Sequence, residues 1–369
     1  MDYSARTLAE VRLALVSGVG PRLRQNLIAA FGSAEAALAA RESELVRVDG
    51  IGAKLAEKIV AAQTEAAALA ELTAAAERGI HVLTHGDEIY PAALREIHDP
   101  PGVLFYRGDW RPTDQLAVGM VGSRHATQYG QRHAERIAAE LARAGVTVVS
   151  GLARGIDGAA HRGALAAGGR TIAVLAGGLN KIYPPEHAKL ADEVAAQGCL
   201  VTEAPPGMVP LAGSFPQRNR IISGLSLGVL VVEADDRSGA LITTRHAAEQ
   251  GREVFAMPGP VDSRLSRGCH ALLRDGAKLV TCAGEILEEL GPLVEPAPLP
   301  TGGELRHVAE LNLNDVEAAV LAHVRTEQTA IDSIVAASGL PAHQVLATVS
   351  VLELRGLVRR VSGQYLRRV

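Results

Sequence analysis

Apolar runs and helical patterns alternate along the middle of the chain. An apolar run at residues 118–122 is followed by a helical pattern at about 127–144 and by a second apolar run at 146–150. The two runs end at Gly122 and Gly151. A helix between two such strands is the crossover that parallel strands require, so the pattern predicts a β-α-β unit.

The alternation continues to residue 256. Apolar runs predict further strands at 171–176, 199–202, 228–233 and 253–256, with helices at about 157–167, 186–197, 218–224 and 240–250. The strands are continuously apolar, which is typical of a sheet that helices cover on both faces. An added strand or strand pair is expected within residues 79–108. The fold class that follows is α/β, with a doubly wound and mainly parallel sheet.

Residues 1–75 show helical patterns interrupted by two similar turns. The turns are Val16–Pro21 and Val48–Gly52, and each contains a glycine, an apolar residue and a second glycine before a helix. They resemble tandem helix-hairpin-helix (SAM-like) elements, whose backbone N–H groups can bind phosphate without reading base sequence. The alternative is that the glycines only make tight turns within a small helical bundle.

Residues 291–307 are a linker by composition, because proline and glycine are frequent and no apolar period is present. Helices are predicted at 314–325, 328–337 and 341–355, followed by a hairpin with a turn at Ser362 and Gly363. This order describes a winged helix, at 308–369. The five arginines after Glu353 are consistent either with a solvated face or with a DNA or protein contact: Arg355, Arg359, Arg360, Arg367 and Arg368.

The composition limits the classes of protein to consider. A chain of 369 residues that is 47% hydrophobic has room for two or three domains. No apolar run approaches the ~18 residues of a membrane helix and no signal peptide is recognisable, so we expect no membrane contact and a cytoplasmic location. The 3 cysteines are far apart, which argues against disulfides or a zinc knuckle. The net charge of −4 conceals 32 Arg against 5 Lys, a bias that a GC-rich genome also explains.

Glycines and cations cluster where the predicted parallel strands end. Carboxyl ends of parallel strands share one edge of a sheet, and bare backbone N–H groups beside guanidinium groups favour a phosphate there. The strand ends predict a phosphate-binding rim made of Gly122, Ser123 and Arg124, of Ser150 and Gly151 with Arg154, of Gly177 and Gly178 with Lys181 and Tyr183, and of Ser238 and Gly239.

The missing motifs narrow the choice of phosphate. The chain contains neither GxxxxGK[ST] nor the dinucleotide pattern GxGxxG followed by an acid, so no nucleotide cofactor is expected. A phosphodiester chain remains, held by arginines along the rim, with Tyr183 stacking on a base.

Catalysis and metal binding receive little support. Asp157 and His161 are four residues apart on a predicted helix and, with Ser150, allow a hydrolase hypothesis. The favoured alternative is that Asp157 complements the helix dipole and that His161 forms a structural hydrogen bond. His125, His133 and His246 lack metal-ligand spacing, so we expect no catalytic residue and no metal.

Six ordered motifs within residues 80–290 resemble the bacterial DNA-processing protein A (DprA/Smf) family. The motifs are VGSRHATQYG, VVSGLARGIDGAAHRGAL, GGRTIAVLAGGLNKIYPPEH, FPQRNRIISGLS, VVEADDRSGALIT and GREVFAMPG. The resemblance implies an extended Rossmann-like domain at 76–290 between the helical and winged-helix domains. It also implies a homodimer that binds single-stranded DNA and loads the RecA recombinase onto it during natural transformation.

The resemblance assigns roles to individual residues. Arg124 corresponds to a DNA-contacting arginine, and Ser150 with Gly151 to the backbone turn of the family's pocket. Lys181 and Tyr183 supply a basic and an aromatic lining, and Arg218, Asn219 and Arg220 form the FPxRNR element. One departure is His270, which stands where the family usually has asparagine. This leaves the role of that asparagine in the pocket or dimer open.

Two alternative functions remain. Related Rossmann-like phosphoribohydrolases cleave nucleoside monophosphates, but they carry a PGGxGTxxE-type loop, and this chain has RSGALITTRHAAEQ at the comparable place. A transcription regulator would require sequence-specific duplex binding by residues 308–369.

Overall fold

A nine-stranded sheet forms the centre of the first of two units in the computed structural model. The structure describes residues 3–62, 64–290, 292–298, 304–308, 310, 313–362 and 364–368. The first unit ends at Leu279 and the second begins at Val280. The central domain predicted from the sequence, 76–290, extends past this boundary and stays a prediction.

The sheet has the order β1-β2-β6-β5-β4-β3-β7-β8-β9. Strands β3 to β9 pair in parallel, while β1 and β2 pair antiparallel to each other and β2 antiparallel to β6. The predicted α/β class with a mainly parallel sheet is therefore confirmed. The bounds are β1 His81–Thr84, β2 Val103–Gly108, β3 Ala117–Val121, β4 Thr147–Ser150, β5 Thr171–Val174, β6 Cys199–Thr202, β7 Gly228–Val231, β8 Glu253–Ala256 and β9 Lys278–Leu279.

The strand order reverses between β3 and β7. From β3 the chain builds outwards through β4, β5 and β6, and it then returns to β7 on the other side of β3. Loops on the two sides of this point leave the sheet in opposite directions, which opens a crevice at the carboxyl ends of the strands.

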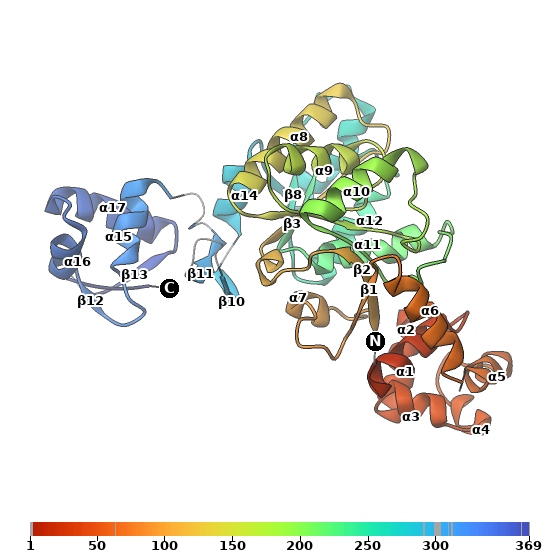
Figure 1. Ribbon diagram of the computed structural model, residues 1–369. Helices are drawn as coiled ribbons and strands as arrows, with labels where there is room; N and C mark the ends of the chain where they lie inside the picture. The colour runs from red at the N-terminus through yellow and green to blue at the C-terminus, as the bar shows by residue number, and fades with distance from the viewer. Residues whose placement is uncertain are drawn as a thin grey trace. The chain divides into compact units, whose positions relative to one another are not determined.

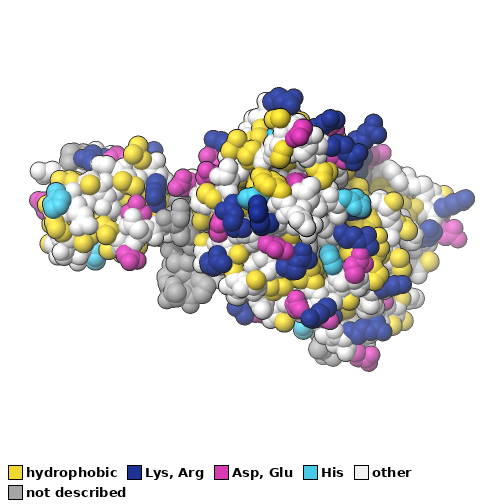
Figure 2. Space-filling model, turned by 90° about the horizontal axis from the view of Figure 1, so that it is seen from above, with side chains coloured by type: hydrophobic (Ala, Val, Ile, Leu, Met, Phe, Trp, Pro, Cys, Tyr) yellow, Lys and Arg dark blue, Asp and Glu magenta, His cyan; other side chains and the backbone are white. Residues whose placement is uncertain are grey.

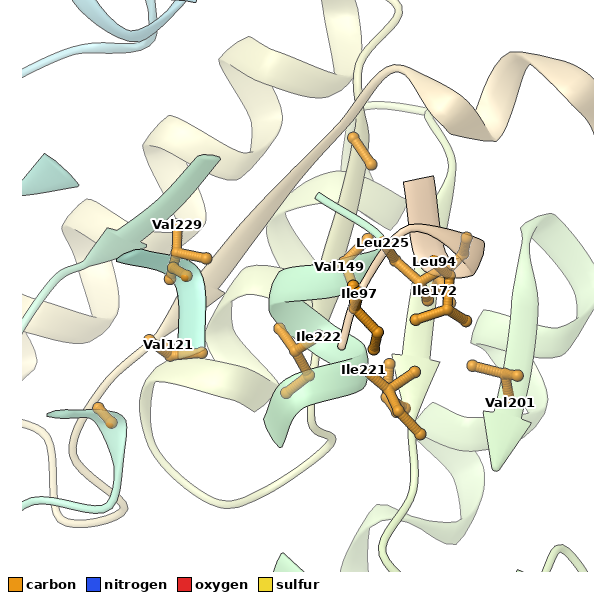
Figure 3. Packing of buried hydrophobic residues seen from close by; sticks show 14 of the residues in the cluster. Leu94, Ile97, Val121, Val149, Ile172, Val201, Ile221, Ile222, Leu225 and Val229 are labelled. Atoms are coloured by element: carbon orange, nitrogen blue, oxygen red, sulfur yellow. The ribbon is translucent and has the colours of Figure 1, made fainter. Parts of the chain in front are cut away.

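Helices cover both faces of the sheet (Figure 1). The helices α8, α9 and α10 lie on one face and α11 and α12 on the other, as double winding requires. Figure 3 shows Ile221 and Ile222 of α11, and Leu225 just after it, packed over the apolar strands. The bounds are α7 Ala92–Arg95, α8 Gln128–Arg143, α9 Ile156–Ala166, α10 Ala188–Gln197, α11 Ser214–Gly224, α12 Ala240–Glu249 and α13 Arg267–Arg274.

Helix α11 begins at Ser214, four residues before the predicted start. The Pro-rich loop after residue 202 led to a predicted helix that begins only at Arg218. Pro216 lies in the first turn, where a missing N–H costs no intrahelical hydrogen bond. The earlier start brings Phe215 and Arg218 onto one rigid element.

The N-terminal helices contribute to two cores. Helices α2 to α5 and part of α1 bury Leu13, Leu27 and Ile59 among themselves. Other residues of α1 and α6, including Leu8 and Leu72, pack against the sheet residue Phe105. The bounds are α1 Ala5–Leu15, α2 Pro21–Phe31, α3 Ala34–Ala39, α4 Glu42–Leu45, α5 Ala53–Ala61 and α6 Ala66–Ala76.

The second unit contains a winged helix, as predicted. Its helices and its β12-β14-β13 sheet enclose Val320, Ile334, Val349 and Leu366. The predicted linker contains the antiparallel pair of β10 and β11. The bounds are α14 Ala283–Glu289, β10 Pro292–Pro298, β11 Glu304–His307, α15 Asp315–Ala322, β12 Thr329–Ala330, α16 Ile331–Ser338, α17 Ala342–Leu354, β13 Val358–Ser362 and β14 Tyr365–Arg368.

Within the described ranges, no single helix is long and apolar enough to cross a membrane. The pair α16 and α17 reaches the required length and composition only jointly, and the two helices meet at 115°.

Candidate nucleic-acid interface

A crevice of 520 Å³ opens at the carboxyl ends of β3 and β7, where the strand order reverses. Ligands of doubly wound sheets bind at this kind of position. The predicted rim residues that follow β3 and the predicted turn Ser238–Gly239 meet here with two predicted residues of α11. The crevice is lined by Gly122, Ser123, Arg124, Phe215, Arg218 and Asn219, among others.

The turn after β3 is fixed by Glu233, which follows β7. The Ser123 N–H donates to the Glu233 carbonyl oxygen at 2.7 Å. The Glu233 carboxylate accepts from the Thr127 N–H at 2.8 Å and from the Thr127 hydroxyl at 2.6 Å. A side chain at Gly122 would lie 2.8 Å from the same carbonyl oxygen, so the turn requires glycine for close approach. This turn presents Arg124 at the surface.

Arg124 lies over an aromatic ring. Its guanidinium carbon is 4.9 Å from the centroid of Phe215, a cation–π distance. In the part of the chain that the structure describes, no carboxylate forms an ion pair with Arg124. Its charge is thus available to a ligand phosphate.

Phe215 extends this contact to Tyr183. The two ring centroids are 5.8 Å apart with planes at 62°, and Tyr183 is 48% exposed. We call Arg124, Phe215 and Tyr183 the aromatic row. Lys181 is exposed on the same loop as Tyr183. The sequence analysis did not select Phe215, although it is one of only 4 phenylalanines and precedes the Arg-Asn-Arg triplet of α11.

Arg218 lies at the floor of the crevice. Its guanidinium occupies the space that a side chain at Gly151 would need, since a Cβ there would lie 1.7 Å from Nη1. The residue is 4% exposed, and its Nε and Nη1 find no hydrogen-bond partner among the described residues. Burial lowers the pKa of Arg218 to about 10, against the favourable charge of Asp157. A buried cation with unmet donors favours an anionic ligand.

Asn219 and Arg220 have different environments. Asn219 lines the crevice and donates from Nδ2 to the Gly239 carbonyl oxygen at 3.3 Å, joining α11 to the predicted Ser238–Gly239 turn. Arg220 is buried and pairs with Asp99 at 2.9 Å and with Glu203 at 2.6 Å. Residues two apart on a helix face different directions. The structure therefore separates Arg220 from the crevice, and we exclude it from the proposed contacts.

Arg154 is also engaged within the protein. Its guanidinium pairs with Glu186, which raises the pKa of Arg154. Both side chains are about half exposed, with values of 51% and 49%. A strand of DNA would have to compete with this carboxylate for Arg154.

The three residues of the hydrolase hypothesis bond to separate partners. The Ser150 hydroxyl donates to the Met120 carbonyl oxygen at 2.6 Å. Asp157 accepts from the N–H groups of Gly151 and Ala153 at 3.1 Å and 3.3 Å, which closes the loop after β4. His161 Nδ1 lies 2.7 Å from the Thr171 hydroxyl. These contacts hold the floor of the crevice together and do not link the three into a triad.

Replacing His161 with glutamine is expected to make stability less sensitive to acid. Burial lowers the pKa of His161 to about 3, from the ordinary histidine value of 6.5. The unfolded chain therefore binds a proton that the folded chain excludes, and stability is lost as the pH falls below the unfolded value. From about pH 7 to about pH 5 the variant should lose about 2 kcal/mol less unfolding free energy than the wild type, as measured by urea titration. An equal loss in both proteins would contradict this.

Charge is mixed on the face of the molecule that Figure 2 draws. Figure 2 shows Lys and Arg side chains in small groups among acidic and apolar ones. Three of the five C-terminal arginines pair with acids: Arg355 with Glu317 at 3.2 Å, Arg360 with Glu353 at 3.6 Å, and Arg368 with Glu310. His270 lies near β8, with its Nε2 3.0 Å from the Gly259 carbonyl oxygen.

Comparison with known proteins gives a consistent result along the chain. The family described as DNA recombination-mediator protein A matches residues 81–291. The DprA winged helix domain matches 306–364, and the SAM-like helix-hairpin-helix tandem matches 10–62.

Individual relatives agree with these matches. Protein Smf of Escherichia coli is 44% identical over 288 residues, which cover 78% of this chain and 77% of the relative. The structure of DNA processing protein A from Streptococcus pneumoniae has a TM-score of 0.68 at 34% identity and covers 79% of this chain and 99% of its own. A Helicobacter pylori structure, described for its single-stranded DNA binding mode, has a TM-score of 0.51 at 32% identity and covers 56% and 93%.

Proposed function

This chain belongs to the DprA/Smf family of DNA-processing proteins, and on that premise we propose that it binds single-stranded DNA in the crevice between β3 and β7. The observation that carries the proposal is the aromatic row above the buried Arg218. It combines the surface cation Arg124, the ring of Phe215 in the crevice, the adjoining ring of Tyr183, and a buried guanidinium that no carboxylate bonds among the described residues.

The arrangement suits a single strand better than a duplex. Phosphates would contact Arg124 and Lys181, and the unpaired bases would stack on Phe215 and Tyr183. Ring stacking accepts any base, because every base has a π-face, so binding would not depend on sequence. In a duplex the base faces are already stacked on one another and cannot reach the rings.

We also propose what the protein does with the bound strand, which is to pass it to a recombinase. The family description of a recombination mediator supports transfer of the strand to the RecA recombinase during transformation. The family resemblance likewise supports a homodimer. The regulator alternative gains no support, because α17, the helix that a winged helix inserts into the major groove, contains no Lys or Arg.

Replacing Phe215 with alanine is expected to weaken binding of an all-thymine single strand by about 1–3 kcal/mol, the contribution of one base-stacking contact. The dependence on salt should stay unchanged, because no charge is removed. Fluorescence anisotropy with single- and double-stranded oligonucleotides over a salt series measures both quantities.

Phe215→Tyr is the matched control and should retain affinity, since it keeps the ring. Wild-type affinity in Phe215→Ala, or tighter binding of the duplex by the wild type, would contradict the proposed site.

A further inference from the structure

A second cavity of 660 Å³ lies beside the crevice, between the N-terminal helices and the sheet. One wall is the turn that joins α1 to α2. The opposite wall comes from residues after β5 and at the end of β6, together with Ser214, Gln217 and Arg218 of α11. Arg218 lines both cavities, so the two meet at its side chain. We call this second cavity the chamber.

The chamber walls are mainly apolar. Leu13, Val19 and Pro101 contribute to the walls, and Met208 and Leu211 form an exposed apolar margin, at 38% and 67% exposure. Glu10 and Arg24 also line it, but they neutralise each other through two hydrogen bonds of 2.7 Å and 2.9 Å. A flat, largely apolar group is the kind of occupant that such walls accommodate.

The Glu203 carboxylate supplies hydrogen-bond acceptors at the mainly apolar wall of the chamber. One of its carboxylate oxygens accepts from Gln217 Nε2 at 3.1 Å and the other from Arg220 Nη2 at 2.6 Å. Each carboxylate oxygen can accept more than one hydrogen bond, so both retain capacity. A carboxylate fixed in this way can accept hydrogen bonds from the amino group on the edge of a nucleobase, a group that thymine lacks.

Arg218 supplies the charge at the junction. It is 4% exposed, and its Nε and Nη1 have no hydrogen-bond partner in the described structure. A phosphate at the junction of the two cavities would lie against this guanidinium. The apolar walls and the Glu203 carboxylate would accommodate a base, and the buried Arg218 guanidinium would neutralise a phosphate. The sugar of the nucleotide would lie between the two.

We propose that the chamber binds one nucleotide whose base carries an amino group, which thymine lacks, with the base beside Glu203 and the phosphate at Arg218. The nucleotide is either a unit of the strand held in the crevice or a free mononucleotide. The inference rests on the proposed function only in the first case, because both sites then share one strand.

The chain offers a matched pair of glycines for the test. Gly20 lines the chamber and precedes α2 with φ −91° and ψ −179°, an extended conformation open to any residue. Gly52 precedes α5 with φ −89° and ψ 168° and is not part of the chamber wall. A Cβ at either position meets no atom within 4 Å. Gly20→Phe therefore adds a ring at the chamber wall, while Gly52→Phe adds the same ring away from that wall.

Two probes distinguish the two sources of nucleotide. Calorimetry with dGMP measures a free mononucleotide, and anisotropy compares an all-thymine strand with the same strand carrying one guanine. We expect the wild type and Gly52→Phe to bind dGMP, or to bind the guanine strand several-fold more tightly than the all-thymine strand. Gly20→Phe should lose this gain, and Gly20→Ala, which leaves most of the volume open, should retain it.

The possible outcomes test the chamber proposal and the proposed function of the crevice independently. All-thymine binding that is equal in all four proteins, with no dGMP binding and no gain from guanine, would overturn the chamber and leave the proposed function intact. An all-thymine strand that fails to bind the wild type would overturn the proposed function. Binding of dGMP that Gly20→Phe abolishes would support the chamber even in that case.

Discussion

Replacing Arg124 with alanine is expected to reduce the affinity for an all-thymine single strand about tenfold at about 0.1 M salt. The slope of log affinity against log salt should fall by about 0.7, the value for one phosphate contact on a single strand. Arg124 is exposed and lies against Phe215, so its removal would take away the proposed phosphate contact and one member of the aromatic row. Removing Lys181 as well should flatten the slope further.

The matched control for this experiment is Arg132→Ala, which removes an exposed arginine from α8 outside the crevice. Both variants have the same net charge, so a difference between them reports position and not overall charge. Equal affinities and equal slopes in the two variants would remove Arg124 from the site. Anisotropy over a salt series, with the oligonucleotide as the labelled species, provides the measurement.

Replacing Arg220 with alanine is expected to act on stability. Its guanidinium has 3% exposure and bonds both Asp99 and Glu203, so the change leaves two carboxylates without their shared cation. Loss of one partner of a buried ion pair costs about 3 kcal/mol at the lower end of the usual range, which suits the partial exposure of Asp99. A decrease in Tm of about 6–12 °C follows for a domain of this size.

Thermal unfolding followed by circular dichroism measures this shift, with Arg245→Ala on the surface of α12 as the control. Well below the lowered Tm, Arg220→Ala should still bind the all-thymine strand. An unchanged Tm combined with lost binding would instead make Arg220 a direct DNA contact.

The contrast between Arg218 and Arg220 shows what the sequence could predict. Continuous apolar runs predicted the strands of the parallel sheet. Glycines at the strand ends indicated the carboxyl edge of the sheet, where the crevice lies. The Arg-Asn-Arg triplet suggested three equivalent contacts, but its two arginines face different sides of α11. Which side faces the crevice depends on how α11 packs on the sheet through Ile221 and Ile222, and that packing is tertiary.

Phe215 and the chamber illustrate the same limit. The ring of Phe215 reaches Arg124 only because α11 begins at Ser214, ahead of a proline that suggested a loop. The chamber exists because Leu8 of α1 shares a core with Phe105 of β2, which places the α1–α2 turn opposite Glu203. Contacts between segments so distant in sequence leave no local pattern to detect.

The Glu233 carboxylate determines how the crevice can respond to a ligand. It is 4% exposed and bonds the Thr127 backbone and side chain, so the end of β7 and the start of α8 are fixed when the protein folds. The loss of conformational entropy that a mobile loop would incur on binding has therefore already occurred in the free protein. In the proposed complex a flexible strand of DNA would meet a preorganised surface, and the nucleic acid would be the partner that adapts its conformation on association.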